Sequence, residues 1–164
     1  WVNLTYKGNM MPIKLDVPLL AQEMPNCCWH TAAMMIWLYH QKQSGRQGPM
    51  NTVPEAYARA NAEPLYWAEF ITLAKKVGMV GLPMANSYTS ADLTNLLTKH
   101  GPLWCCGMWY GPCHVIVLTG AEPGRVYLND PDQGVKKNGT IGWFNDKLYS
   151  AASCSIMMKD PARY

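Results

Sequence analysis

Two adjacent cysteines in a polar loop are the residues of this sequence that most readily support covalent chemistry. Cys27 and Cys28 follow Asn26, a good helix N-cap, and precede the largely apolar residues 31–38. We therefore expect a helix from about residue 27 to residue 41. The unpaired N–H groups and the dipole at a helix start stabilise a thiolate, so the pattern predicts a nucleophile. The alternative is a pair of buried cysteines that only pack.

Further residues accompany these thiols in an order that is typical of one enzyme superfamily. Gln22 lies six positions before Cys28, and Trp29 follows Cys28 directly. Far downstream, His114 is followed sixteen positions later by Asp130. In their order and in these two gaps, the residues resemble the papain-like cysteine peptidases, and the resemblance covers nearly the whole chain.

Other segments make the resemblance closest to one branch of that superfamily. Residues 101–104, 114–120 and 129–131 look most like the bacterial branch that contains the double-glycine leader peptidases, and bacterial effector proteases share the pattern. Two residues depart from it: Cys27 stands beside the candidate nucleophile, and the bulky His30 replaces a residue that is small in many relatives. The resemblance implies an α+β, papain-like fold without a cofactor, in which a helical part with the catalytic helix packs on a C-terminal antiparallel sheet.

The roles of four residues follow from the chemistry of acyl transfer in such an enzyme. The Cys28 thiolate attacks a carbonyl, and His114 holds the ion pair and protonates the leaving amine. Asp130 orients the imidazole, where papain itself has an asparagine. The Gln22 amide and the backbone N–H of Cys28 form an oxyanion hole. These four residues are the predicted catalytic set.

Hairpin geometry gives a separate reason to pair His114 with Asp130. We expect Thr119 to pair with Arg125 around a five-residue loop. His114 then lies opposite Asp130 on the same face, within orienting distance, and Asn129 points to the other face. A loop one residue shorter would break this pairing, because a slip of one residue turns every side chain over.

Along the rest of the chain, predicted helices come before predicted strands, which is an α+β order. Residues 1–20 are expected to form an extended arm or edge strand, and residues 42–54 an exposed connection. Periodicity predicts helices at 55–61, 64–77 and 91–99, and strands at 103–109, 113–119, 125–129 and 153–158.

Composition indicates one ordinary globular domain that spans residues 1–164. Hydrophobic residues make up 49% and charged residues 15%, which excludes a disordered chain. A net charge of +3 lacks the footprint of a nucleic-acid binder. No apolar run approaches the ~20 residues of a membrane span, so we expect no membrane partner. Because the sequence begins at Trp1 and not at Met, we expect a piece excised from a longer chain.

The six cysteines are expected to be mostly reduced thiols. Adjacent cysteines rarely bridge each other, and a disulfide framework is typical of shorter chains that lack a core. Cys105, Cys106, Cys113 and His114 are near in sequence, but zinc ligands usually come in pairs separated by about two to four residues. We therefore expect no metal site and a reducing site of action.

The sequence is interpreted as a thiol protease that hydrolyses peptide bonds. The resemblance suggests an antibacterial effector or toxin domain, secreted or injected by bacteria, that acts in the cytoplasm of a target cell. Its substrate would be a protein, cut after glycine if leader-peptidase specificity extends to it, and a cognate immunity or inhibitor protein is left open. The alternatives are a cysteine amidase or deamidase acting on cell-wall peptide or glutamine, a transporter-linked leader peptidase, and an inactive binding module.

Overall fold

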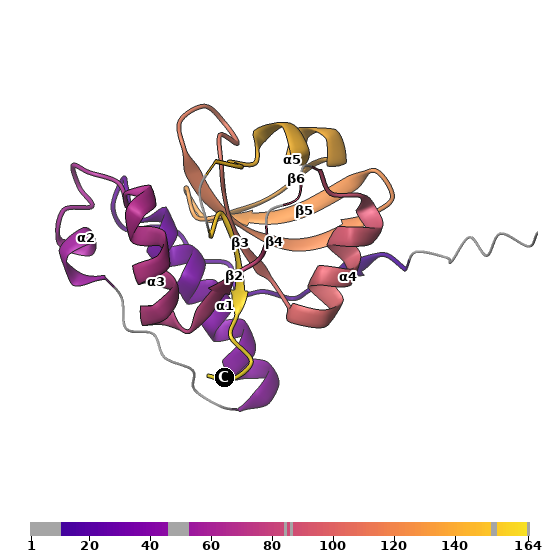
Figure 1. Cartoon of the computed structure of the whole chain (residues 1–164), viewed down its shortest axis with the longest axis horizontal. Coiled ribbons are helices and arrows are strands. Elements are labelled where there is room, and N and C mark those ends of the chain that lie inside the picture. The colour runs from indigo at the N-terminus through magenta and orange to yellow at the C-terminus, as the bar shows by residue number, and fades with distance from the viewer. Residues whose placement is uncertain (1–10, 46–52, 84, 86, 152–153, 164) are drawn as a thin grey trace, which may run out of the picture.

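The computed structural model describes residues 11–45, 53–83, 85, 87–151 and 154–163. Helices α1 to α3 gather on one side of the molecule, and an antiparallel sheet with two further helices forms the other (Figure 1). This mixture confirms the expected α+β class. The elements are β1 (Ile13–Lys14), α1 (Cys28–Ser44), α2 (Pro54–Ala58), the 3₁₀ helix η1 (Trp67–Glu69), α3 (Phe70–Val77), β2 (Met79–Gly81), α4 (Ser90–His100), β3 (Leu103–Gly107), β4 (His114–Glu122), β5 (Arg125–Asp130), β6 (Val135–Thr140), α5 (Ile141–Lys147) and β7 (Ile156–Lys159).

Helix α1 begins one residue later than its sequence suggests. Cys27 is the N-cap and makes no side-chain cap, while the backbone carbonyl of Asn26 accepts a hydrogen bond from the Trp29 indole (2.9 Å). The expectation that Asn26 caps the helix is therefore wrong, and Cys28 is the first helical residue. The helix stops where Gly45 adopts a left-handed conformation (φ 68°), which the missing Cβ permits.

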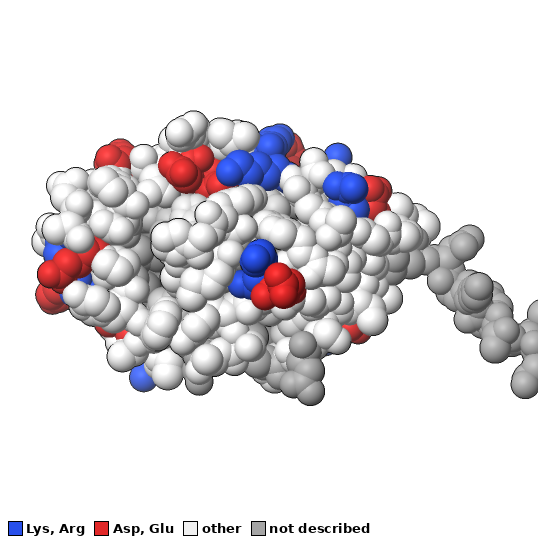
Figure 2. Space-filling model, turned by 90° about the horizontal axis from the view of Figure 1, so that it is seen from above, with Lys and Arg blue, Asp and Glu red and all other residues white. Residues whose placement is uncertain are grey.

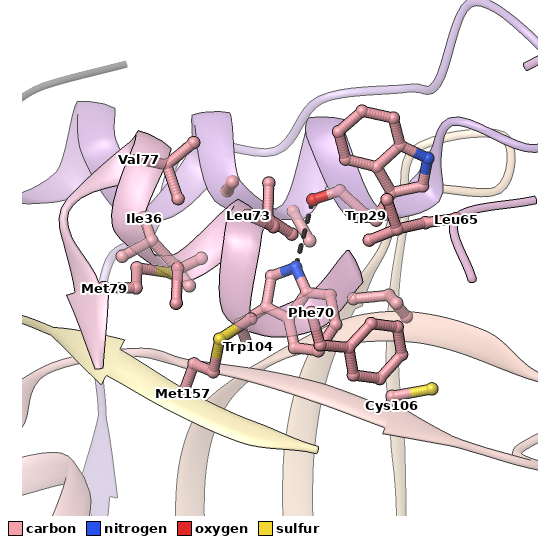
Figure 3. Close-up of a cluster of buried hydrophobic side chains, with 14 of the residues drawn as sticks. Trp29, Ile36, Leu65, Phe70, Leu73, Val77, Met79, Trp104, Cys106 and Met157 are labelled. Carbon is pink, nitrogen blue, oxygen red and sulfur yellow. Dashed lines mark hydrogen bonds between the residues drawn. The ribbon is translucent and has the colours of Figure 1, made fainter. Parts of the chain in front are cut away.

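The buried face of α1 packs against α3 and one face of the sheet (Figure 3). Trp104 of β3 is fully buried, and its indole N–H donates to the backbone carbonyl of Trp29 (3.0 Å). Phe70, at the start of α3, meets the Trp104 ring edge-on with centroids 5.1 Å apart. Leu73 and Met157 complete this packing. Each such side chain stabilises the fold by about 1.5–3 kcal/mol, so the start of α1 is held firmly against the sheet.

The sheet has the strand order β2-β7-β3-β4-β5-β6, and β1 pairs with β4. Its second face is covered by α4 and α5 through a separate cluster that includes Leu97, Leu118 and Phe144. Because both faces are covered, β3 and β4 are almost completely buried and read as near-continuous apolar runs. That is the reason why these two strands could be predicted from the sequence.

The hairpin between β4 and β5 has a register that differs from the expected one. Glu122 pairs with Arg125 around a two-residue turn, in which Gly124 has a φ of 79°. The register then shifts at Thr119, which is the extra residue of a β-bulge. The expected pairing of Thr119 with Arg125 is therefore wrong. The Thr119 carbonyl accepts from the backbone N–H of Leu15 (2.8 Å), so the segment that carries β1 supports the bulge.

Three elements were not expected from the sequence: β2, which is only three residues long, β6 and α5. Strand β6 is a mostly exposed edge strand of polar residues, so it has no apolar alternation to detect. Helix α5 contains Gly142 and Asn145, both poor helix formers. It forms because the Thr140 hydroxyl caps it, accepting a hydrogen bond from the Trp143 N–H (3.0 Å).

The remaining predicted elements occur with shifted ends. Helix α4 begins at Ser90, because Thr89 and Asp92 form reciprocal capping bonds of 3.1 and 2.8 Å. Helix α3 stops at Gly78, as expected. Part of the expected arm forms β1, whereas residues 1–10 lie outside the described residues, as do residues 46–52 of the expected connection and residues 152–153.

Charged side chains are sparse and mixed in sign on the face that Figure 2 shows. Lys and Arg lie beside Asp and Glu there, and uncharged residues cover most of the area. Within the described ranges, no helix combines the length and the apolar character that a membrane crossing needs.

Candidate active site

A cleft of about 530 Å³ is lined both by helical segments and by the sheet. Its lining includes Pro64, Leu65, Trp67 and Phe70 from one segment, and residues 112–115 with Cys106 from the sheet and the loop before β4. Cys28 from α1 and His114 from β4 both line this space. The fold therefore brings together two predicted site residues that are far apart in the sequence.

The two adjacent cysteines have different surroundings. Cys27 is only 1% exposed, and its Sγ exchanges hydrogen bonds with the backbone of Met24 at 3.3 and 3.4 Å. It lines a separate, smaller hollow together with His30 and Tyr57. Cys28 is partly exposed and faces the main cleft. Of this pair, Cys28 is the thiol that a ligand in the main cleft can reach.

The His114 ring lies between the Cys28 thiol and the Asp130 carboxylate. Its Nε2 is 2.6 Å from Oδ1 of Asp130, and the ring is also hydrogen-bonded to the Cys28 side chain. Burial lowers the pKa of His114, but the hydrogen bonds to Asp130 and Cys28 and the charges of both groups raise it more, to about 10. The ring is therefore an imidazolium at neutral pH, as a thiolate beside it requires.

Asp130 is fully buried and satisfied by three donors. Besides His114, the Nζ of Lys137 lies 2.7 Å from Oδ2, and the backbone N–H of Asp132 donates to Oδ1 (2.9 Å). Burial raises the pKa of Asp130, but the hydrogen bonds from His114, Lys137 and the Asp132 backbone hold it below its usual value. The Lys137 ammonium also lies over the Tyr110 ring, 4.1 Å from the centroid.

Sequence reasoning missed Lys137. The only signal was the basic doublet that it forms with Lys136, and basic doublets are common on solvated surfaces. Lys137 lies in β6, the polar edge strand that carries no apolar alternation. Because Val135 pairs with Asp130 in the β5-β6 ladder, the strand carries Lys137 to the buried carboxylate.

The β-bulge decides which face of the sheet Asp130 shares. The β4-β5 ladder ends at Val117 and Asn129, so one step further Ile116 would lie opposite Asp130. His114 is the next β4 residue on the Ile116 face, and its side chain reaches Asp130 diagonally. Without the extra residue, Asp130 would share the face of Val117, and His114 would point to the other side.

The Gln22 side chain lies in the loop that leads into α1, but its amide is engaged there. Its Nε2 donates to the backbone carbonyls of Met24 and Pro25, both at 2.9 Å. Both amide hydrogens are thus directed at the loop, while Oε1 is buried without a hydrogen-bond partner among the described residues. The backbone N–H of Cys28, the first residue of α1, has no intrahelical acceptor.

The cysteine-rich segment near His114 splits between the two faces of the sheet. Cys106 belongs to the cluster on the α1 side, whereas Cys105 belongs to the cluster on the opposite side. Among the residues that the structure describes, no three His, Cys, Asp or Glu side chains are grouped as metal ligands.

Comparisons with known proteins agree with this geometry. One similar solved structure is a double-glycine motif protease from an AMS/PCAT transporter, in complex with the leader peptide; it is 18% identical, with a TM-score of 0.54. The match covers 90% of this chain and 95% of that chain, which shows a shared fold. A protein-family model described as papain-like cysteine protease AvrRpt2 matches residues 11–149. The resemblance to papain-like cysteine peptidases is thus confirmed, and the chain belongs to the family of the papain-like cysteine protease AvrRpt2 and is a cysteine-type peptidase.

Proposed function

We propose that this peptidase hydrolyses peptide bonds of intact proteins through Cys28, His114 and Asp130. The observation that carries the proposal is the hydrogen-bonded series from the Cys28 side chain through the His114 ring to the buried Asp130 carboxylate. In this series, the ring Nε2 is occupied by Asp130. Nδ1 is therefore the ring nitrogen that remains for the thiol and for the leaving group.

In the acylation step, the Cys28 thiolate attacks the carbonyl carbon of the scissile bond. The negative charge that develops on the carbonyl oxygen is stabilised by the backbone N–H of Cys28 at the positive end of α1. The His114 imidazolium then gives its Nδ1 proton to the leaving amine, and the C–N bond breaks. The products are a thioester on Cys28 and a free amino terminus.

In the deacylation step, neutral His114 takes a proton from water, and the resulting hydroxide attacks the thioester. The acid product leaves, and the thiolate-imidazolium pair is restored. Asp130 keeps the ring in one orientation through both steps. Gln22 is proposed as the second oxyanion donor, and this role needs a rotation that releases one Nε2 hydrogen from the carbonyls of Met24 and Pro25.

The Lys137 ammonium should set the pH range of this reaction. Lys137→Met removes a positive charge from Asp130, so the pKa of Asp130 rises and the acid limb of kcat/KM moves to higher pH. Loss of the Lys137 charge also favours the His114 imidazolium and raises the pKa of His114, so the alkaline limb of kcat/KM moves to higher pH as well. The substitution also leaves the buried Oδ2 of Asp130 without its donor, so we expect the free energy of unfolding to fall by about 1–3 kcal/mol.

Two variants provide the matched comparison for Lys137. Lys137→Arg keeps a cation and should retain most of the wild-type pH profile. Lys136→Met removes an equal charge from the neighbouring, exposed position of β6 and should leave the profile unchanged. Identical profiles for Lys137→Met and Lys136→Met would show that Lys137 does not act on the site.

The pKa of His114 also predicts how stability depends on pH. The folded-state value of about 10 lies above the ordinary value of 6.5. While Asp130 stays ionised, the stabilisation that His114 contributes is therefore complete below pH 6.5 and is lost as the pH rises through about 10.

The mostly apolar lining of the cleft favours a polypeptide substrate with apolar side chains over a single glutamine side chain. This lining includes Leu65, Trp67, Phe70, Pro112 and Val115. The solved double-glycine motif protease was bound to a leader peptide. By analogy, we propose that this chain cuts after glycine; a narrow groove at the position before the cut would produce this specificity, because it excludes residues that carry a side chain.

We further propose that the chain is an effector or toxin that acts in the cytoplasm of a bacterial target cell. Expression in a bacterial cytoplasm should then be toxic, and Cys28→Ala or His114→Ala should remove the toxicity. Mass spectrometry of new protein N-termini in the same cells should show cuts after glycine in the wild type that the Cys28→Ala cells lack. Such a toxin implies a cognate inhibitor protein in the producing cell, which should restore growth when co-expressed.

Export to the periplasm distinguishes the proposed protease from the main alternative, a cell-wall amidase. A cell-wall amidase would kill cells when exported and spare them when kept in the cytoplasm. If toxicity required export and released peptidoglycan fragments without new protein N-termini, the amidase function would replace the protease function. New N-termini after residues other than glycine would overturn the specificity alone.

A further inference from the structure

A second pair of thiols lies on the wall of the same cleft and takes no part in the proposed reaction. The Sγ atoms of Cys106 and Cys113 are 2.7 Å apart, and both cysteines are free. Both residues line the cleft that also holds Cys28. This distance is shorter than the van der Waals contact of two sulfur atoms and longer than the about 2.05 Å of a disulfide bond, so the fold holds the two sulfurs within easy reach of bonding.

The strand pairing explains why these two residues meet. Cys106 pairs with Val115, and Gly107 pairs with His114, in the β3-β4 ladder. Cys113 directly precedes His114, so it is a diagonal neighbour of Cys106 on the same face of the sheet. The contact therefore depends on the backbone of the central hairpin and not on one flexible side chain.

The two thiols differ in accessibility and in acidity. Cys113 is exposed, whereas Cys106 is fully buried. The hydrogen bond from Cys106 lowers the pKa of Cys113 and outweighs burial, and the Trp67 indole and the His114 charge lower it further, to about 7. The hydrogen bond to Cys113 and burial raise the pKa of Cys106. At neutral pH, a large fraction of Cys113 is thus a reachable thiolate, and Cys106 is its protonated partner.

We propose that Cys106 and Cys113 are a redox-active dithiol, which hydrogen peroxide oxidises to a disulfide in the cleft wall. The Cys113 thiolate attacks one peroxide oxygen, the O–O bond breaks, and the released hydroxide takes up a proton to become water, leaving a sulfenic acid on Cys113. The Cys106 sulfur then attacks the Cys113 sulfur, the S–O bond breaks, and the oxygen leaves as water with the Cys106 proton. Two thiols lose two electrons, and one peroxide becomes two molecules of water.

The disulfide would change the lining of the cleft and leave Cys28, the proposed nucleophile, as a free thiol. Closing the sulfur-sulfur distance from 2.7 Å to about 2.05 Å needs little movement of the chain. The bond removes the Cys113 thiolate that accepts a hydrogen bond from Trp67, so it breaks a contact between two residues that line the cleft. If the proposed site of action is correct, cytoplasmic thiols would keep the pair reduced there.

The disulfide can be tested without any protease activity, which separates this proposal from the proposed function. Full-length Cys28→Ala protein is treated with a small excess of hydrogen peroxide, blocked with iodoacetamide and digested with chymotrypsin. Chymotrypsin cuts after Trp109 and Tyr110, so only a disulfide can join the peptide with Cys106 to the peptide with Cys113. We expect this cross-linked pair, a loss of two alkylatable thiols per chain, and full reversal by dithiothreitol.

Three variants in the Cys28→Ala background identify the residues. Cys113→Ser changes an exposed position and should remove the cross-link without affecting folding. Cys106→Ala should also remove it, which distinguishes Cys106 from Cys105 in the same peptide. Cys154→Ser, at a half-buried thiol elsewhere in the chain, should leave the cross-link intact.

Two results would overturn the proposal. In the first, peroxide oxidises Cys113 to a sulfinic acid, and Cys106 still reacts with iodoacetamide. In the second, the same experiment on wild-type protein finds Cys28 joined to Cys106 or Cys113, so that the pair does not react within itself.

Discussion

Cys28→Ala is expected to lower kcat for peptide hydrolysis by a factor on the order of 10⁴–10⁶, because the variant loses the thiol that attacks the carbonyl and carries the thioester. Cys28 faces the main cleft and is hydrogen-bonded to the His114 ring. The measurement is the initial rate of release of new amino termini from a protein substrate, at equal concentrations of folded wild type and variant.

The adjacent cysteine provides the control. Cys27→Ala removes the hydrogen bonds between the thiol and the Met24 backbone in a buried position, so we expect a loss of about 1 kcal/mol in the free energy of unfolding. Its kcat should stay close to that of the wild type. Labelling with iodoacetamide at neutral pH should modify Cys28 before Cys27, and the assignment fails if Cys27 is labelled while Cys28 is spared.

Asp130→Ala is expected to lower kcat by several powers of ten, because the His114 ring loses the acceptor that orients it. Asp130→Asn should cost less, since an amide oxygen can still accept from Nε2. Both changes also leave Lys137 without a carboxylate partner, so stability should be measured for each variant by denaturant unfolding and kcat corrected for the folded fraction.

Asn129→Ala is the matched control at the neighbouring position. The Asn129 amide donates to the Val17 carbonyl (3.2 Å) and contacts Met35 Sδ (3.7 Å), so it ties β5 to the N-terminal segment and to α1. Its loss should reduce stability by about 1–3 kcal/mol and leave the kcat of the folded protein nearly unchanged. Equal losses of kcat in Asn129→Ala and Asp130→Ala would mean that Asp130 does not orient the histidine.

Much of the fold could be predicted from the sequence where a local signal decides the structure. The apolar residues of α1, β3 and β4, the capping residues Thr89 and Asp92, and the stop at Gly78 all act over a few positions. Polar segments gave no such signal. Strand β6 and helix α5 form because neighbouring elements and the Thr140 cap hold them, and not because their residues favour these states.

The candidate site could likewise be predicted only in part. The residue types and spacing of Cys28, His114 and Asp130 determined by themselves which chemistry to expect, since a thiol hydrolase needs a nucleophile, a base and an orienting group. The contact between His114 and Asp130 was expected for the wrong reason. The shorter turn alone would have put their side chains on opposite faces, and the bulge at Thr119 reverses that change.

Only the tertiary structure decided the surroundings of these groups. Three features depend on segments that are distant in sequence or on the path of the backbone. They are the bulge that Leu15 supports, the Asp130 carboxylate that binds Lys137, and the Gln22 amide that its own loop holds. The sequence determines residue types and local periodicity, because these act over one or two turns of chain. The register of a hairpin and the partners of a buried charge are decided by packing energies of the whole fold, so no local pattern contains them.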